Sequence, residues 1–161
     1  GRLVVQFHKN QAFVILKGEN INRFIVKTIL TDSFNNNLFP GYENVNITWK
    51  KLQRVIDKDT WKTALVNQKG VYLISDNATG KMYVGSAYGQ DMLLGRWKSY
   101  VTTGHGGNVE LKKLSFDYIK ENFSYSILEI YKSTTEDQII INRESWWKEV
   151  LNSRKFGYNI N

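Results

Sequence analysis

The 161-residue sequence contains no cysteine and only two histidines. Without cysteine the chain has no disulfide, no thiolate metal site and no cysteine nucleophile. Two histidines supply too few nitrogen ligands for a typical zinc site, so any bound metal should be a hard cation on oxygen ligands. The sequence also shows no signal peptide and no apolar run long enough to span a bilayer, so a cytoplasmic location is expected.

Positive charge and aromatic side chains are abundant instead. Lys and Arg number 22 against 15 Asp and Glu, which gives a formal net charge of +7 and a pI near 9.5. This balance favours an anionic partner, nucleic acid before any other, although a basic protein without such a partner is the open alternative. Hydrophobic residues make up 42% of the chain, enough for one packed domain or a small domain with an appendage.

Residues 1–66 and 67–161 differ in pattern and are treated as two parts. The first part shows strand-like and helix-like runs, with one segment of undecided type: Leu3–Phe7, Ala12–Leu16, Ile21–Leu30 (undecided), Trp49–Ile56 and Thr60–Leu65. It carries no recognisable motif, so we expect a β-containing N-terminal extension or accessory domain of unknown role. Because the chain begins with Gly1 rather than Met, a piece of a longer protein is also expected.

The second part predicts the element order strand, strand, helix, helix, strand, helix. Turn residues at Asp76–Gly80 separate the first two strands and predict a hairpin. Helices are expected over 91–102, 108–122 and 133–151, the second with Asn108 as N-cap and the third opening on a capping box. With a third strand over 124–130, these elements predict an α+β fold in which helices flank a small three-stranded antiparallel sheet.

The last predicted helix carries a carboxylate within an apolar stripe. Ile140, Glu144, Trp147 and Leu151 recur at i, i+4, i+7 and i+11, so they share one face. A carboxylate that is partly buried needs a cation or a hydrogen-bond partner. A metal ion and a salt bridge with a nearby Lys or Arg are both compatible with this spacing.

The first predicted helix places Arg96 and Tyr100 on one face, beside an apolar face made by Leu93, Trp97 and Val101. The arginine and the phenol should therefore point together away from the core. A guanidinium suits a phosphoryl oxygen, because it stays charged and donates in a fixed fork. A solvated surface arginine is the alternative.

Two Gly/Tyr triplets frame the hairpin, Gly70-Val71-Tyr72 and Tyr83-Val84-Gly85. They resemble the two triplets of the GIY-YIG nuclease family, with Val in place of Ile in both. The stretch that continues into Ser86 is similar to excision-repair nucleases of the family, which carry Lys where this chain has Ser86. Lys81 and Lys98 are the candidates to substitute for that lysine.

The resemblance extends to the later helices and covers residues 70–161. Family members carry an Arg on the helix after the hairpin, a Tyr or His four residues on, a metal-binding Glu on a later helix and often an Asn near the domain end. This chain offers the matching residues in the same order: Tyr72, Tyr83, Arg96, Tyr100, Glu144 and Asn159.

The resemblance implies a DNA endonuclease that hydrolyses phosphodiester bonds with one divalent ion, Mg²⁺ or Mn²⁺, held by Glu144. Arg96 would stabilise charge on the phosphate. Tyr72 would act as general base, with Tyr83 and Tyr100 positioning water, phosphate or Tyr72. A phenol is a poor base at its ordinary pKa of about 10, so the metal and the arginine must make the phenolate accessible. These five side chains are expected to converge on one cleft.

The glycine-rich loop Thr103–Asn108 is a weaker candidate for the site. Its glycines allow close backbone approach, and N–H groups near Asn108 could meet a phosphate. His105 could take a proton or touch DNA, and a flexible loop between helices is the alternative.

Two other classes of function stay open. A non-catalytic nucleic-acid-binding module on the same fold would explain the charge and the aromatics, but not Glu144 in an apolar stripe beside a tyrosine and arginine set. A protein-interaction domain would be favoured by a surface without a continuous basic cleft.

Overall fold

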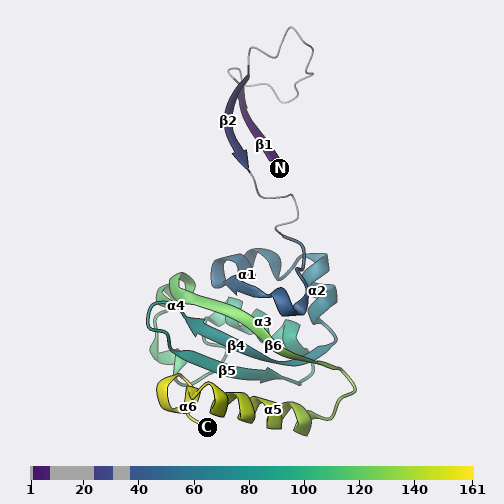
Figure 1. Cartoon of the computed structure of the whole chain (residues 1–161), viewed down its shortest axis with the longest axis vertical. Coiled ribbons are helices and arrows are strands. Elements are labelled where there is room, and N and C mark those ends of the chain that lie inside the picture. The colour runs from purple at the N-terminus through teal and green to yellow at the C-terminus, as the bar shows by residue number, and fades with distance from the viewer. Residues whose placement is uncertain (1, 8–23, 31–36) are drawn as a thin grey trace. The chain divides into compact units, whose positions relative to one another are not determined.

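The computed structural model describes residues 2–7, 24–30 and 37–161. The chain divides into two compact units, residues 1–37 and 38–161 (Figure 1). In the first unit, strands β1 (Arg2–Phe7) and β2 (Phe24–Leu30) pair antiparallel. The segment of undecided type therefore contains a strand. The strand predicted at 12–16 lies outside the described residues.

The second unit is built on a four-stranded antiparallel sheet in the order β3-β6-β4-β5. Its strands are β3 (Asn46–Thr48), β4 (Gln68–Asp76), β5 (Met82–Ala87) and β6 (Phe123–Lys132). The predicted α+β fold is confirmed, but the prediction of three strands is wrong. The additional strand, β3, has three residues that pair with β6, and so short a run gives no readable alternation.

Residues 38–66 pack against this sheet. The helices α1 (Trp49–Val55) and α2 (Asp59–Leu65) form where the spacing predicts them, and their apolar faces bury Trp49 and Trp61 in the same core as Tyr72. The compact unit thus begins at residue 38, whereas the sequence-based division places the first 66 residues together. The apolar faces of these two helices join residues 38–66 to the core of the second unit.

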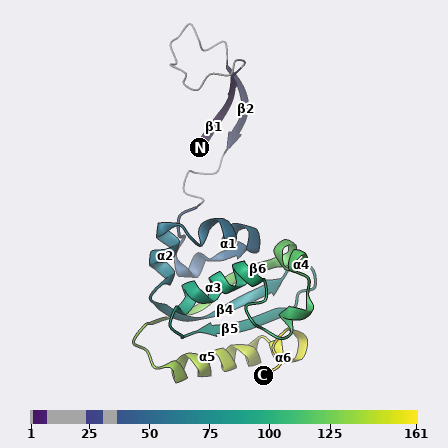
Figure 2. The same cartoon turned by 180° about the vertical axis from the view of Figure 1, so that it is seen from behind.

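Helices cover both faces of the sheet (Figures 1 and 2). On one face, α3 (Met92–Thr103) packs on β4 and β5 together with α1, α2 and α4 (Phe116–Asn122). On the other face, α5 (Asp137–Val150), followed by the short α6 (Ser153–Phe156), packs on the same two strands. In the described part of the chain no helix is long and apolar enough to cross a membrane.

The single helix predicted over 108–122 is wrong, because the chain becomes extended at Leu114 and a new helix begins after Ser115. The Asn108 side chain accepts a hydrogen bond from the Leu111 N–H at 2.9 Å, but Leu111 begins only a 3₁₀ turn, η3 (Leu111–Lys113), whose N-cap is Glu110. Leu114 is then extended, and Ser115 caps α4 by accepting from the Tyr118 N–H. A serine in this position is a strong N-cap and starts a new helix.

The capping box predicted at 133–136 is also wrong, because no side chain caps α5. Instead Lys69 of β4, which is 9% exposed, donates to the Thr135 carbonyl and to Oδ1 of Asp137, both at 2.7 Å. A lysine of the sheet therefore anchors the start of the helix that carries Glu144.

The hairpin turn between β4 and β5 forms as predicted and is held by a buried carboxylate. Asp76 is 1% exposed and accepts hydrogen bonds from Thr79 Oγ1, Tyr118 and Tyr158. Burial opposes its ionisation, yet these hydrogen bonds, led by that of Tyr158, lower the pKa of Asp76. Asp76 thereby ties the hairpin to α4 and to the C-terminal segment.

Candidate active site

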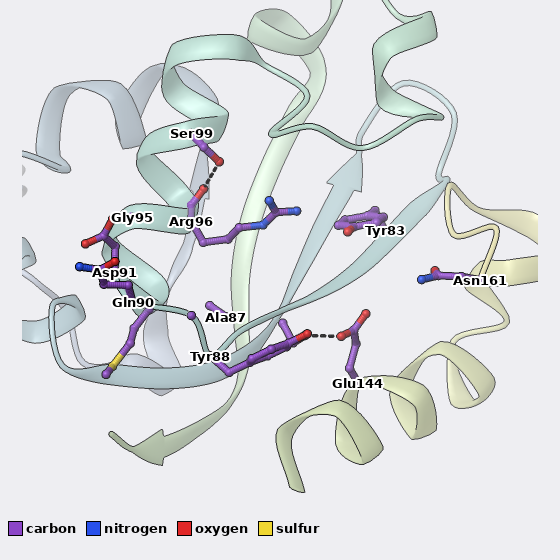
Figure 3. A pocket seen from close by; sticks show the side chains of 13 residues that line it. Tyr83, Ala87, Tyr88, Gln90, Asp91, Gly95, Arg96, Ser99, Glu144 and Asn161 are labelled. Carbon is purple, nitrogen blue, oxygen red and sulfur yellow. Dashed lines mark hydrogen bonds between the residues drawn. The ribbon is translucent and has the colours of Figure 1, made fainter. Parts of the chain in front are cut away.

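A pocket of about 540 Å³ opens beside β5, which is the edge strand of the sheet on the side opposite to β3. Its lining comes from β5, from the loop that follows, from α3 and α5, and from the end of the chain (Figure 3). It includes Tyr83 and Ser86 of β5, Arg96 of α3, Glu144 of α5, and Asn161. Elements far apart in the sequence thus contribute polar side chains to one concave site.

Three of the five residues predicted to be catalytic line this pocket, namely Tyr83, Arg96 and Glu144. Tyr72 and Tyr100 are fully buried and reach the pocket only through Arg96. The Arg96 Nε donates to the Tyr72 hydroxyl at 2.9 Å, and its Nη2 donates to the Tyr100 hydroxyl at 3.1 Å. The two phenols also share a hydrogen bond of 2.9 Å. One arginine therefore connects the buried tyrosines to the cleft.

The second triplet ends in glycine because Tyr72 needs the space. Tyr72 lies directly across the hairpin from Gly85. A Cβ at Gly85 would come within 2.4 Å of the Tyr72 hydroxyl oxygen, closer than any real contact. The glycine of one triplet therefore makes room for the tyrosine of the other.

Glu144 approaches the pocket from the face of the sheet opposite to the tyrosines. Successive strand residues point to opposite faces, so Tyr83 joins the core under α3, whereas Val84 joins a smaller core with Ile140 of α5. Ser86, on the same face as Val84, donates to the Glu144 carboxylate. The two faces meet in one pocket because β5 is the edge strand.

Arg96 and Tyr100 lie on the same face of α3, as their spacing predicts. That face is turned toward the buried Tyr72 and not away from the core. The guanidinium lies 4.9 Å from the centre of the Tyr100 ring and also donates to the Gly106 carbonyl at 2.8 Å. Its partial burial would lower the pKa of Arg96, but the neighbouring phenols of Tyr72 and Tyr100 raise it. The site therefore holds a permanent positive charge.

The three tyrosines differ in their access to the pocket. Burial raises the pKa of the Tyr72 and Tyr100 phenols, and the nearby Arg96 opposes this effect without overcoming it. Tyr83 is 8% exposed and lines the pocket, and its hydroxyl forms no hydrogen bond with any residue that the structure describes. Tyr83 is thus the phenol whose oxygen can meet a water molecule there.

The Glu144 carboxylate has partners on both oxygens. Ser86 donates to Oε2, and the ammonium of Lys148 lies 2.7 Å from Oε1. Of the two alternatives that the spacing left open, the salt bridge is therefore present. Lys148 is not among the predicted site residues, although its place four residues after Glu144 is the usual spacing of a helical ion pair.

The pocket contains oxygen donors of the kind that a hard divalent ion takes, but few of them. Among the residues that the structure describes, no three of His, Cys, Asp and Glu gather into a metal site. Glu144 and Asp91 each contribute a carboxylate to the lining, and Ser86 and Asn161 line the same pocket. Since Mg²⁺ keeps several waters and is commonly held by one or two carboxylates plus substrate phosphates, this small set suffices only with a phosphate present.

A network around Glu129 of β6 fixes the helix that carries Glu144. The Glu129 carboxylate accepts from Arg143 Nε and Trp147 Nε1, both at 2.9 Å, and from the Tyr131 hydroxyl. The hydrogen bonds from Arg143 outweigh the effect of burial and lower the pKa of Glu129 to about 2. Arg143 and Trp147 flank Glu144 in sequence, so the network sets the rotation of α5.

Glu129→Gln is expected to lower the free energy of unfolding at pH 7 by about 2–3 kcal/mol, since it leaves the donors but removes the charge. Because the pKa of Glu129 is lower in the folded than in the unfolded chain, its stabilisation is complete above about pH 5 and is lost as the pH falls toward 2. Urea unfolding at pH 7 and pH 3 measures both effects. Glu149→Gln, at an exposed position of the same helix, is the control. An equal loss of stability on acidification in wild type and Glu129→Gln would contradict the assignment.

The two lysines predicted to substitute for the family lysine lie outside the pocket lining. Lys81 is exposed near the hairpin turn, with its ammonium 5.5 Å from the centre of the Tyr158 ring. Lys98 pairs with Asp57 at 2.8 Å. The sequence position alone did not show which way either side chain points.

The glycine-rich loop supports the arginine. A Cβ at Gly106, where φ is +54°, would come within 2.6 Å of the Tyr100 ring, so glycine permits the close approach that brings the Gly106 carbonyl to Arg96. The Nδ1 atom of His105 accepts from the Gly107 N–H, and the Asn108 side chain accepts from the Leu111 N–H, both at 2.9 Å. A phosphate contact by His105 or Asn108 stays a prediction.

Asn159 has a supporting position. It is 2% exposed, and its amide accepts from the Val84 N–H and donates to the Val84 carbonyl, both at 2.9 Å. The side chain thus pairs with the outer edge of β5 and holds the C-terminal segment against it. Asn159 thus supports the edge of β5, and a DNA contact by this residue stays a prediction.

Comparisons with known proteins identify the family of this segment. Residues 68–159 match the family model described as the GIY-YIG catalytic domain. Intron-associated endonuclease 1 of Enterobacteria phage T4 is 35% identical over 96 residues, which are 58% of this chain and 37% of that relative's length. Two structures of the catalytic domain of the intron endonuclease I-TevI, one of them a mutant, are 34% identical. They cover 58% of this chain and 94% and 98% of their own, with TM-scores of 0.46 and 0.45.

Proposed function

The chain belongs to the GIY-YIG family, and on this premise we propose that it is a DNA endonuclease that hydrolyses phosphodiester bonds in the pocket beside β5. One observation carries the proposal. A single pocket joins a charged guanidinium, a free phenol and a carboxylate, contributed by Arg96, Tyr83 and Glu144. The net charge of +7 suits the phosphate backbone of DNA.

Arg96 binds the scissile phosphate and stabilises the negative charge that grows on it. Three of its N–H donors are used within the protein, one each by Tyr72, Tyr100 and Gly106. A guanidinium has five N–H donors, so two remain for phosphate oxygens. Tyr72 and Tyr100 hold this guanidinium in place before DNA binds.

In this proposal the Tyr83 side chain, as its phenolate, takes the proton from the attacking water and becomes the neutral phenol. The resemblance assigns that role to Tyr72, but the Tyr72 phenol is buried, its pKa is raised, and its oxygen accepts from Arg96. A general base must come within hydrogen-bond reach of the water, and of the two hairpin tyrosines only Tyr83 lines the pocket.

Glu144, with oxygens of Ser86 and Asn161, would hold one divalent ion, Mg²⁺ or Mn²⁺. Such an ion supplies positive charge to the phosphate and to the leaving oxygen. The role of Glu144 itself is to present an anionic oxygen to the pocket, opposite the guanidinium of Arg96. The phosphate would then lie between two sources of positive charge.

A non-catalytic nucleic-acid-binding module is the second candidate, and the Glu144–Lys148 ion pair favours it, because that carboxylate is already neutralised. Incubation of supercoiled plasmid with the protein, in Mg²⁺ and in EDTA, separates the two. Nicked or linear product that requires Mg²⁺ supports the nuclease. Retardation of the plasmid without cleavage in either condition supports the binding module.

DNA affinity is expected to fall steeply with salt, because a basic surface that neutralises phosphates releases their counterions. For about six phosphate contacts the affinity should drop roughly 10³-fold between 50 and 200 mM KCl. Fluorescence anisotropy of a labelled duplex in EDTA measures this without cleavage. A binding isotherm that is the same at both salt concentrations would exclude the basic surface as the main source of affinity.

A further inference from the structure

Lys148 is a buried cation that has no part in the reaction proposed above. It lies one helical turn after Glu144 on α5 and is 5% exposed. Its ammonium is 2.7 Å from Glu144 Oε1 and 3.1 Å from the side-chain oxygen of Asn161. Within the described ranges, Glu144 is the one carboxylate that pairs with it.

The ammonium stands behind the carboxylate as seen from the pocket. Glu144 lines the pocket and Lys148 does not, while Ser86 engages the other carboxylate oxygen. Withdrawal of Lys148 would leave a buried ammonium without its counter-charge, which is strongly unfavourable. The positive charge therefore stays close to any ion that Glu144 binds.

We infer that Lys148 is a positioning residue that holds the Glu144 carboxylate toward the pocket and weakens its hold on a divalent ion until DNA is bound. This inference rests on the proposed function, since it takes Glu144 as the ion ligand. Without DNA, a divalent ion meets a carboxylate and an ammonium whose charges cancel, so the attraction is small.

Bound DNA restores the net negative charge that the Glu144–Lys148 ion pair lacks. A phosphate in the pocket adds a negative charge and an oxygen ligand for the ion. Ion and DNA should therefore bind with positive coupling, and by linkage each strengthens the other by the same factor. A site of this kind stays largely empty of metal until the substrate is present.

The test is the affinity of the full chain for Mn²⁺ without DNA, measured from the electron paramagnetic resonance signal of free Mn²⁺. Lys148→Met removes the charge and keeps a long apolar side chain, and it is expected to lower the Mn²⁺ dissociation constant about tenfold or more. Lys148→Arg keeps the charge and should stay close to wild type. Lys148→Gln, which can still donate to Glu144, should follow Lys148→Met and carries the test if the Met variant does not fold.

The coupling is read from DNA affinity with and without Ca²⁺, in samples checked for intact DNA. The gain in affinity caused by the ion should be larger for wild type and Lys148→Arg than for the uncharged variants. A purely structural role for Lys148 would change stability without changing this ratio.

Two adverse outcomes are distinguishable. If the uncharged variants bind Mn²⁺ no more tightly than wild type, while Glu144→Gln abolishes that binding, the inference about Lys148 is overturned and the Glu144 ion site stands. If Mn²⁺ binding survives Glu144→Gln both in the wild-type chain and in the chain that carries Lys148→Met, Glu144 is not the ligand. The ion site of the proposed function then falls together with this inference.

Discussion

Replacing Glu144 with glutamine is expected to lower the rate of divalent-ion-dependent DNA cleavage by at least about 10³-fold, while DNA affinity stays within a few fold of wild type. The amide keeps the size of the side chain and an oxygen that can accept from Lys148 or Ser86. It lacks the negative charge that a hard divalent ion requires. Arg96 and the basic surface, which bind the phosphates, are untouched.

Glutamine is a sharper replacement than alanine because of Lys148. From the sequence alone, Glu144→Ala should be harmless to folding, since it removes a carboxylate from an apolar stripe. The structure reverses that expectation, because alanine leaves the buried ammonium of Lys148 with neither a counter-charge nor an acceptor at position 144, whereas the glutamine oxygen can still accept from it. Removing one partner of a buried pair costs about 3–5 kcal/mol, so the activity of an alanine variant would mix lost chemistry with lost stability.

Conversion of supercoiled plasmid to nicked and linear forms, in Mg²⁺ and in EDTA, measures the loss. Anisotropy of a labelled duplex in EDTA measures binding for the same preparations. Glu149→Gln is the matched control, because it removes an exposed carboxylate from the same helix and should cleave normally. A Glu144→Gln protein that nicks plasmid as fast as wild type would show that this carboxylate is not needed for catalysis.

The sequence was sufficient for the elements that carry strong local patterns. The hairpin turn at Asp76–Gly80, α3 and α5 follow from turn chemistry and from apolar residues at helical spacing. The motif residues Arg96 and Tyr100 lie on a shared face for the same reason. What could not be predicted depends on neighbours distant in sequence, such as the pairing of the short β3 with β6.

The position of β5 at the edge of the sheet is the clearest example of that limit. No local pattern states which strand is the edge, yet this position lets Tyr83 from one face and Glu144 from the other line one pocket. The position of β5 also explains why Tyr83 lines the pocket and Tyr72 does not. Both have strand-like surroundings in sequence, but Tyr72 lies under α3 across from Gly85, whereas Tyr83 is on the edge strand.

That difference leads to a paired test of the general base. Tyr83→Phe is expected to reduce the single-turnover cleavage rate by about 10²–10⁴-fold, the usual contribution of a positioned base. Tyr72→Phe deletes a hydroxyl that accepts from Arg96 Nε, so it should loosen the guanidinium and cost roughly tenfold, the effect of about one hydrogen bond to a charged group. Both changes keep the ring and its packing.

The pH dependence of the rate separates a base from a positioning residue. A rate that depends on a deprotonated base should rise with pH. Tyr72→Phe should keep that rise at a lower overall rate, whereas Tyr83→Phe should flatten it. Single-turnover kinetics, with excess protein and saturating divalent ion, ensure that chemistry and not product release is measured. If Tyr72→Phe instead flattens the profile and Tyr83→Phe keeps it, Tyr72 is the base, and its buried phenol must open to the pocket when DNA binds.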